Sequence, residues 1–298
     1  MASQPEKKVF IVTGGASGIG LGITRYLITQ QHPTLTPTHI AIFDINAETG
    51  NSVVSSLQQE YKSTSSATIS FHQCDVSSWE SQAAAFKEVA QQQGRVDYVV
   101  ANAGITEKGD LLEKEAEPSK PVLATLNVNL VGVVYSTKLA VHYIRKNGST
   151  SSTKGGIICT ASNAGIYPFP MAPMYATTKH GVVGLVRSLA RPLALEGIQI
   201  NALAPAVIET NIASSLDLFK NMIITPMSTV IKAVEILLTS SPSPNSTSAN
   251  AKPLPETTIL TGKIAECHEG NVTFAEQPAY VDENTGKNIE MFWNLGYA

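Results

Sequence analysis

A short apolar run near the start of the chain leads directly into a cluster of glycines. Residues 9–12 are typical of a buried parallel strand, and Gly14, Gly18 and Gly20 follow at once. A helix is expected to begin near residue 18. A turn without side chains lets a pyrophosphate approach backbone N–H groups at the positive end of such a helix. The glycine spacing differs from Gly-x-Gly-x-x-Gly, so an ordinary glycine-rich turn is the alternative.

A second apolar run, residues 39–43, ends in Asp44. A carboxylate at the end of this strand could accept hydrogen bonds from both hydroxyl groups of an adenosine ribose, and it would repel a 2′-phosphate. No Arg or Lys stands at Ser17 or directly after Asp44 to compensate for that charge. The pattern therefore favours NAD over NADP as the cofactor. The alternative is that Asp44 only caps the helix expected from residue 46.

Apolar runs and helical patterns alternate along most of the chain. The alternation predicts a doubly wound parallel sheet, a Rossmann-type three-layer α/β/α fold, in a single domain over residues 1–298. The expected strands are 8–13, 39–43, 68–73, 96–101, 156–161 and 198–203, and the expected helices are 18–30, 46–61, 78–93, 119–146, 173–191 and 228–239. A last strand is expected near residues 257–260.

Tyr175 and Lys179 stand four residues apart on a predicted helix, so their side chains share one face. The ammonium group is expected to lower the pKa of the phenol from about 10, with help from a positively charged nicotinamide, so that the phenol can carry a proton. Such a pair also occurs by chance on solvated helices. Ser162 follows the strand 156–161, where open α/β sheets place ligands, although it could be only a turn cap.

Several motifs in the first 210 residues occur together in one order. They are Thr13 to Gly20, Asp75-Val76, Asn102-Ala103-Gly104, Asn129, Ser162, Tyr175 with Lys179, Asn201-Ala202, Pro205 and Thr210. In this order and spacing the chain resembles the classical short-chain dehydrogenase/reductase family over roughly residues 7 to 210. The segment from Tyr175 to Gly181, together with Asp44, is similar to the hydroxyprostaglandin dehydrogenase-like group. One departure is Ala206, where the family usually has glycine after the proline.

The resemblance implies a role for each matching residue. Ser162 would hydrogen-bond the substrate oxygen, Tyr175 would exchange its proton, and Lys179 would tune the phenol and hold the nicotinamide ribose. Asn129 would position a water in a proton relay, although Asn127 is close enough to be confused with it. The expected cofactor contacts are Gly14, Ser17, Gly18, Ile19, Gly20, Asp44, Asp75, Val76, Asn102, Ala103, Gly104, Tyr175, Lys179, Pro205, Val207 and Thr210. Asn102 is expected to be partly structural.

Composition excludes several other classes of function. The net charge is −3 and the pI is about 6.1, which gives no basic surface for nucleic acid or an anionic membrane. No apolar stretch approaches the ~18 residues of a membrane span, and no signal-peptide core is present at the N-terminus, so a cytoplasmic location is expected. Cys74, Cys159 and Cys267 are widely spaced and are expected to be buried thiols, with no metal site.

The C-terminal third carries further expectations. Residues 211–227 are expected to cover the substrate, residues 240–256 to form a mobile loop rich in Ser, Pro and Asn, and residues 263–298 to form an extension. The apolar end, 291–298, would pack over a pocket, on a neighbouring subunit, or on its own subunit. The helices 119–146 and 173–191 match those that form the family's dimer interface, which implies a homodimer or homotetramer.

These features together predict an NAD(H)-dependent oxidoreductase that interconverts a secondary alcohol and a ketone. Apolar residues at 166–171 and Met174 flank the catalytic pair, which favours an apolar small-molecule substrate. One alternative is a family member recruited to natural-product biosynthesis, as a ketoreductase or as a non-redox cyclase or epimerase. Another is a dinucleotide-binding protein without turnover.

Overall fold

The protein has one sheet between two layers of helices. The computed structural model describes residues 8–30, 36–148, 153–208, 222–239 and 259–295. Within these residues eight strands form one sheet in the order β3-β2-β1-β4-β5-β6-β7-β8. The strands are β1 (Lys8–Thr13), β2 (Pro37–Asp44), β3 (Thr68–Gln73), β4 (Tyr98–Ala101), β5 (Gly155–Thr160), β6 (Ile198–Pro205), β7 (Ile264–His268) and β8 (Asn271–Phe274). All neighbouring pairs are parallel except β7 and β8.

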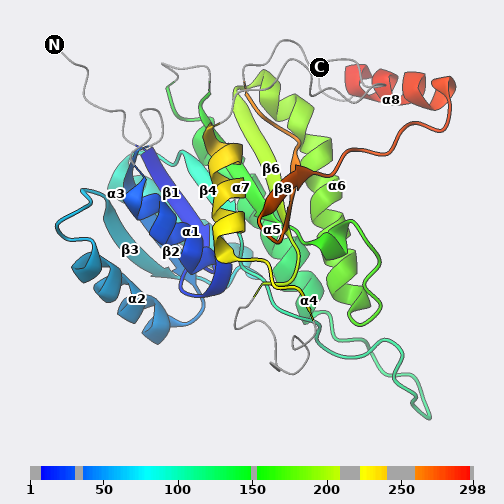
Figure 1. The fold of residues 1–298 in the computed structure, drawn as a ribbon, viewed down its shortest axis with the longest axis horizontal. Helices are drawn as coiled ribbons and strands as arrows, with labels where there is room; N and C mark the ends of the chain where they lie inside the picture. Colours follow the sequence, from blue (N-terminus) through cyan, green and yellow to red (C-terminus); the bar gives the residue numbers. More distant parts are fainter. Residues whose placement is uncertain (1–7, 31–35, 149–152, 209–221, 240–258, 296–298) are drawn as a thin grey trace.

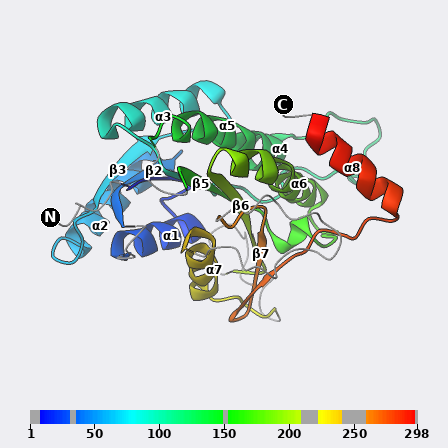
Figure 2. The same cartoon turned by 90° about the horizontal axis from the view of Figure 1, so that it is seen from above.

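The helices cover both faces of this sheet. Their bounds are α1 (Gly18–Thr29), α2 (Ala47–Glu60), α3 (Trp79–Gln93), α4 (Ala124–Leu126), α5 (Gly132–Ile144), α6 (Pro173–Leu195), α7 (Met227–Thr239) and α8 (Glu283–Leu295). Helices α3, α5 and α6 lie on one face, and α1, α2 and α7 lie on the other (Figures 1 and 2). The predicted doubly wound single domain is confirmed.

Local sequence signals set the ends of several elements. All six residues of β1 are buried, as expected of a strand covered on both faces. Asn46 caps α2 by accepting a hydrogen bond from Thr49 N at 3.0 Å, and Ser78 caps α3 in the same way. Gly94 ends α3 with a φ of 79°, a conformation that glycine adopts at little cost.

The order of the strands fixes where a ligand can bind. The chain moves outward from β1 to β2 and β3, then returns to the other side of β1 with β4, β5 and β6. The connections therefore diverge between β1 and β4, and they leave a crevice at the carboxyl ends of these two strands. The glycine turn follows β1 and the Asn102-Ala103-Gly104 motif follows β4, so both motifs meet at this crevice.

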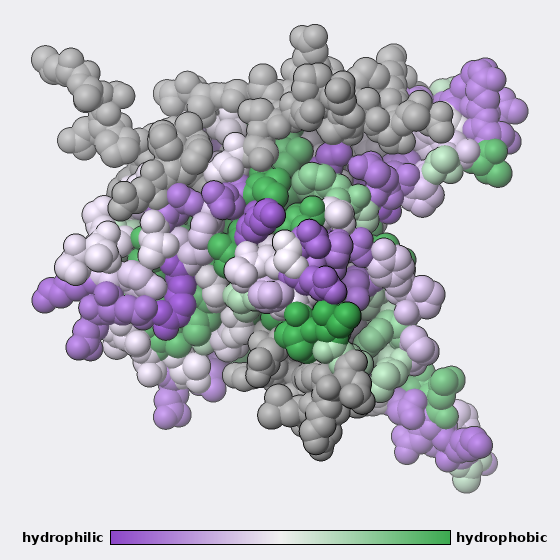
Figure 3. Space-filling view, viewed as in Figure 1, coloured by the Kyte–Doolittle hydropathy of each residue, from purple (hydrophilic) through white to green (hydrophobic). Residues whose placement is uncertain are grey.

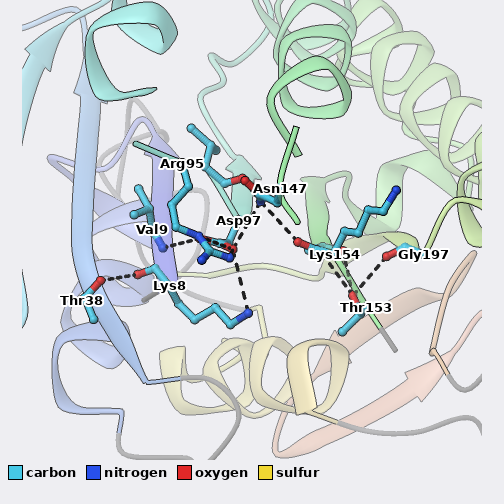
Figure 4. Close-up of polar contacts among 11 residues, drawn as sticks. Lys8, Val9, Thr38, Arg95, Asp97, Asn147, Thr153, Lys154 and Gly197 are labelled. Carbon is cyan, nitrogen blue, oxygen red and sulfur yellow. Dashed lines mark hydrogen bonds and ion pairs between the residues drawn. The ribbon is translucent and has the colours of Figure 1, made fainter. Parts of the chain in front are cut away.

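At the opposite end of the sheet a buried carboxylate joins three segments (Figure 4). Asp97 is fully buried, and it accepts hydrogen bonds from Val9 N at 2.9 Å and from Arg95 Nη2 at 2.6 Å. Burial raises the pKa of Asp97, and Arg95 opposes that change. Asn147 Nδ2 contacts Asp97 at 3.4 Å and Val96 O at 2.7 Å. This network therefore fixes β1, β4 and the end of α5 far from the crevice.

Two boundaries differ from the sequence prediction. The predicted strand near 257–260 is wrong in its described part, because Leu260 lies in an irregular segment and the strand begins only at Ile264. Gly262, with a φ of 75°, turns the chain beside β6 before the strand begins. The predicted helix 119–146 begins instead at Ala124, and its residues Asn127–Val131 form a π-helical turn.

The C-terminal region is divided between the sheet and a separate helix. Residues 264–268 and 271–274 of the predicted extension form β7 and β8, and the residues after Phe274 lie outside the sheet. Arg191 of α6 contacts α8 in two ways. Its Nη1 atom forms an ion pair with Glu290 Oε2 at 3.0 Å, and its Cζ atom lies over the Trp293 ring, 5.8 Å from the ring centre. Arg191 stands sixteen residues after Tyr175, roughly 24 Å along α6. The described part of α8 therefore contacts its own subunit and does not line the cleft. Met291 and Phe292 are exposed, so packing on a neighbouring subunit stays a prediction.

Other predictions concern the cysteines and the C-terminal loops. Cys74, Cys159 and Cys267 are buried free thiols, as predicted. Residues 211–221 of the predicted substrate-covering segment and all of the predicted loop 240–256 lie outside the described residues.

Candidate active site

A cleft of about 480 Å³ opens at the carboxyl ends of β1, β4 and β5. It gathers residues that are far apart in the sequence and that were predicted to bind substrate or cofactor. The predicted residues that line it are Gly14, Ser17, Gly18, Ile19, Asp44, Asp75, Val76, Asn102, Ala103, Gly104, Ser162, Tyr175, Lys179 and Pro205. The glycine turn and the Tyr-x-x-x-Lys pair therefore share one cleft.

The glycine turn is shaped so that side chains are excluded from it. Gly14 and Gly18 have φ values of 63° and 49°, in the left-handed region. A Cβ on Gly14 would lie 2.9 Å from Ala103 Cα, and a Cβ on Gly20 would lie 2.1 Å from Gly14 O. Gly20 does not line the cleft, so its role is to let α1 pack against the turn. The cradle has the close backbone approach that a dinucleotide pyrophosphate requires.

Asp44 lies at the edge of this cradle. Its Oδ2 atom accepts a hydrogen bond from Ala16 N, and its Oδ1 atom accepts one from Asn46 N, both at 3.2 Å. Asn46, not Asp44, provides the side-chain cap of α2. The alternative that Asp44 is only a helix cap is therefore wrong, since it braces the glycine turn and lines the cleft.

Asn102 joins three strands beneath the cleft. Its Nδ2 group donates to Thr13 O at 3.1 Å, and its Oδ1 atom accepts from Thr160 Oγ1 at 3.1 Å. The Thr13 hydroxyl in turn accepts from the backbone N–H groups of Asn102 and Ala103, at 2.9 and 3.0 Å. Asn102 lines the cleft and also ties β1 to β5, which agrees with the mixed role predicted for it.

Asn129 supports one wall of the cleft from behind. It is fully buried in the π-helical turn, whereas Asn127 is exposed, so the two candidates are distinguished. The Asn129 side chain accepts from Ile105 N and donates to Ile105 O, both at 2.8 Å. The amide therefore holds the segment that follows β4 through its oxygen and one of its N–H groups. Asn129 does not itself line the cleft.

Ser162 combines a turn cap with a position in the cleft. Its Oγ atom accepts from Ala164 N at 3.1 Å, which begins the short 3-10 turn Asn163–Gly165. The hydroxyl also donates to Asn163 Oδ1 at 3.1 Å. Interaction with the same hydroxyl acts to lower the pKa of the Tyr175 phenol. Ser162 is therefore a turn cap that also lines the cleft, and its contact with a substrate stays a prediction.

Lys179 and Tyr175 lie on one face of α6, as predicted, with the Lys179 Nζ atom 5.4 Å from the centre of the Tyr175 ring. Lys179 is 3% exposed, and its ammonium group donates to Thr160 O at 2.7 Å. Burial lowers the pKa of Lys179 to about 8. Burial also raises the pKa of Tyr175 above its ordinary value, and the Ser162 hydrogen bond opposes this increase. In the protein alone, burial sets the direction of the Tyr175 pKa shift. The expected lowering by Lys179 together with a nicotinamide stays a prediction.

The structure adds residues that the sequence motifs did not indicate. Thr160, the last residue of β5, receives the Lys179 ammonium on its carbonyl oxygen. Glu107 contacts the start of α6 from the segment after β4. Further residues that line the cleft are Phe43, Ile45, Cys74, Ile105, Thr106, Lys108, Val128, Ala161, Ala206 and Ile208. The end of a predicted strand could have indicated Thr160, but no local pattern pointed to Glu107.

Among the predicted cofactor contacts that the structure describes, Gly20 and Val207 do not line the cleft. The carbonyl oxygen of Val207 accepts from Thr225 N at 2.7 Å, which holds the chain just before α7. Thr210 lies outside the described residues. Among the residues that the structure describes, no group of three or more His, Cys, Asp or Glu side chains could hold a metal ion. No described helix is long and apolar enough to cross a membrane.

Apolar side chains of residues 167–171 lie beside the start of α6, although they do not line the cleft itself. The Phe169 ring is 6.4 Å from the Tyr175 ring, and Tyr167, Phe169 and Met171 are all exposed. A second segment, residues 109–123, projects from the body of the protein at the lower right of Figure 1. Figure 3 shows hydrophilic and hydrophobic residues side by side at that place, and Leu112 is 81% exposed.

The comparisons with known proteins agree on one family. The family model described as short chain dehydrogenase matches residues 8–221. A short-chain dehydrogenase/reductase of Acremonium egyptiacum is 35% identical over 210 residues, which are 68% of this chain and 64% of that protein. The chain thus spans less than two thirds of that relative. The human 15-hydroxyprostaglandin dehydrogenase [NAD(+)] is 34% identical over 219 residues, 72% of this chain and 73% of that protein.

Solved structures show the same fold. The 3-hydroxyacyl-CoA dehydrogenase type-2 of Mycobacterium avium has a TM-score of 0.70 and is 23% identical, and the match covers 93% of this chain and all of that one. The family model spans β1 to the end of β6, and with it the whole set of cleft motifs up to Pro205. The chain belongs to the short-chain dehydrogenase family.

Proposed function

We propose that this protein is an NAD(H)-dependent oxidoreductase that interconverts a secondary alcohol and a ketone on an apolar small molecule. One observation carries the proposal: Ser162, Tyr175 and Lys179 lie in the same cleft as the glycine turn and Asp44. A proton carrier and a dinucleotide cradle are thus adjacent. A bound nicotinamide would supply the hydride acceptor or donor that the protein side chains lack.

The chain's own residues would bind the cofactor and move the proton. The glycine turn would hold the pyrophosphate, and Asp44 would accept hydrogen bonds from the adenosine ribose. Ser162 would hydrogen-bond the substrate oxygen, and the phenol of Tyr175 would take the hydroxyl proton or return it in reduction. Lys179 would hold the nicotinamide ribose and stabilise the phenolate by its charge. Asn129 would act by holding the cleft wall at Ile105.

Support for NAD over NADP comes from the charge at the adenosine end of the cleft. Asp44 lies there, and neither Ser17 nor the residues directly after Asp44 supply a cation. A 2′-phosphate beside Asp44 would meet like charge. The 34% identical human relative carries NAD(+) in its name. A homodimer or homotetramer is part of the same proposal, as is a cytoplasmic location.

A screen of secondary alcohols and ketones tests the proposal, with nicotinamide absorbance followed in parallel with NAD(H) and NADP(H). We expect turnover with NAD(H), and we expect Tyr175→Phe to abolish turnover while it leaves cofactor binding intact. Retained activity in Tyr175→Phe would exclude this phenol as the proton carrier. Mass spectrometry of the products distinguishes the non-redox alternative, in which the product has the oxidation state of the substrate. Cofactor binding without any turnover would favour a non-catalytic protein.

A further inference from the structure

The first turn of α6 lacks the usual cap. The residue before the helix is Ala172, which has no side-chain acceptor, and Pro173 has no N–H group. The first backbone hydrogen bond of the helix runs from Ala176 N to Ala172 O at 2.9 Å. The N–H groups of Met174 and Tyr175 therefore have no partner within the helix and need acceptors from elsewhere.

Glu107 supplies both acceptors from a distant part of the chain. Its Oε1 atom accepts from Met174 N at 3.1 Å, and its Oε2 atom accepts from Tyr175 N at 2.6 Å. A carboxylate is favourable here because the N-terminus of a helix carries positive potential, and hydrogen bonds to a charged acceptor are short and strong. One side chain thus binds the backbone of the residue that carries the phenol.

The segment that carries Glu107 is itself held on both sides. Asn129 binds Ile105 with two hydrogen bonds. The buried hydroxyl of Thr125 donates to Thr106 O at 3.1 Å and accepts from Lys108 N at 3.0 Å. Ile105, Thr106 and Lys108 line the cleft. Glu107 therefore joins a fixed wall of the cleft to the helix that carries Tyr175.

We propose that Glu107 is a positioning residue that sets the place of Tyr175 relative to the wall of the cleft. The inference rests on the proposed function, since Tyr175 is the proton carrier there. Without the Glu107 carboxylate, the first turn of α6 can shift, and the phenol moves relative to Ser162. A displacement of about 1 Å in a catalytic group can cost about 100-fold in rate.

The test is Glu107→Gln, which keeps the side-chain size but replaces one acceptor oxygen with an N–H donor. The matched control is Asp282→Asn, which neutralises a carboxylate that caps α8 through Thr285 N at 2.7 Å. We expect Glu107→Gln to lower kcat by about 10- to 100-fold, with the KM for the cofactor little changed. The limb of the pH profile that reports the phenol should move to higher pH, because the phenol moves away from Ser162, whose interaction lowers its pKa. Asp282→Asn should change neither kcat nor the pH profile.

Hydrogen exchange gives a readout that does not depend on activity. Amides 174 and 175 should exchange faster in Glu107→Gln than in the wild type, while the rest of α6 stays protected. If these amides exchange faster in Glu107→Gln but the wild type turns over no alcohol or ketone, the proposed function is wrong, while the hydrogen bonds from Glu107 to α6 are supported. Unchanged exchange at both amides would overturn the inference. So would a kcat close to that of the wild type, or a loss of thermal stability with an unaltered pH profile.

Discussion

The ammonium group of Lys179 is bound by the backbone of β5, through Thr160 O at 2.7 Å, and not by the phenol of Tyr175. Thr160 is also fixed through its hydroxyl, which donates to Asn102. The position of the charge is therefore set by the sheet. A buried ammonium with one carbonyl partner loses much of its hydration, and this loss lowers the pKa of Lys179 to about 8.

This burial predicts a pH-dependent cost to stability. Below pH 8, Lys179 is protonated in both the folded and the unfolded chain, and the folded chain bears the whole cost of the buried charge. Between about pH 8 and 10.5 the folded chain releases the proton first, so its stability increases with pH. Lys179→Met removes this dependence. Between pH 7 and 9.5, we expect the free energy of unfolding of the wild type to rise by about 2 kcal/mol relative to that of the variant. This value follows from about 1.4 kcal/mol for each unit of pKa shift.

Urea denaturation at several pH values measures this difference. Lys87→Met is the control, since Lys87 is an exposed lysine on α3 and its replacement should leave the pH dependence of the wild type unchanged. A constant difference between the wild type and Lys179→Met from pH 7 to 9.5 would show that Lys179 keeps its ordinary pKa in the folded protein.

Local patterns were sufficient to predict most of the sheet and much of the cleft. The run before Gly14 forms a wholly buried strand, and Asp44 ends the next strand at the same edge of the sheet. Parallel strands place their carboxyl ends together, so motifs that follow successive strands converge without any further information. The glycine turn after β1 and Ser162 after β5 share one cleft for this reason.

The contacts that the sequence did not indicate are all between distant segments. Glu107 caps α6 from 68 residues away, and nothing around Glu107 marks it as a cap. The strand after residue 260 was misplaced because Ile259 and Leu260 are buried and apolar without being in a strand. Burial raises the pKa of Tyr175, and the burial of a phenol cannot be read from spacing along a helix.

The charge of Asp44 predicts the choice of cofactor. Asp44→Asn keeps an acceptor oxygen for the glycine turn but removes the charge that would meet a 2′-phosphate. Like charges in contact cost several kcal/mol, so we expect the preference for NAD(H) over NADP(H) in kcat/KM to fall by about 10- to 100-fold. The measurement is steady-state kinetics with both cofactors.

Asp75→Asn provides the comparison, since Asp75 also lines the cleft but is expected at the adenine. Its cofactor preference should stay close to that of the wild type. An unchanged preference in Asp44→Asn would mean that the adenosine ribose does not lie at Asp44.

The hydrogen bonds of Asn102 predict that its removal lowers the stability of the fold and not only the activity. Asn102→Ala leaves the Thr13 carbonyl and the Thr160 hydroxyl without their partner. An unsatisfied buried group costs about 1 to 3 kcal/mol, so the free energy of unfolding should fall by at least that amount. Urea denaturation measures it. Asn51→Ala is the control, because the Asn51 amide donates to Ala47 O on an exposed part of α2. This variant should change the free energy of unfolding by less than about 0.5 kcal/mol. Equal losses in both variants would contradict the structural role of Asn102.

The outer faces of α5 and α6 predict the oligomeric state. Val134 on α5 and Leu195 on α6 are 41% and 63% exposed, and a Cβ on Gly184 of α6 would meet no atom within 4 Å. Two copies of such a face can pair about a twofold axis. We expect light scattering to give a dimer or tetramer for the wild type, and Gly184→Arg to shift it towards the monomer because a long charged side chain blocks close approach. Gly148→Arg, in open space after α5, should leave the mass unchanged. A monomeric wild type at micromolar concentration would exclude this interface.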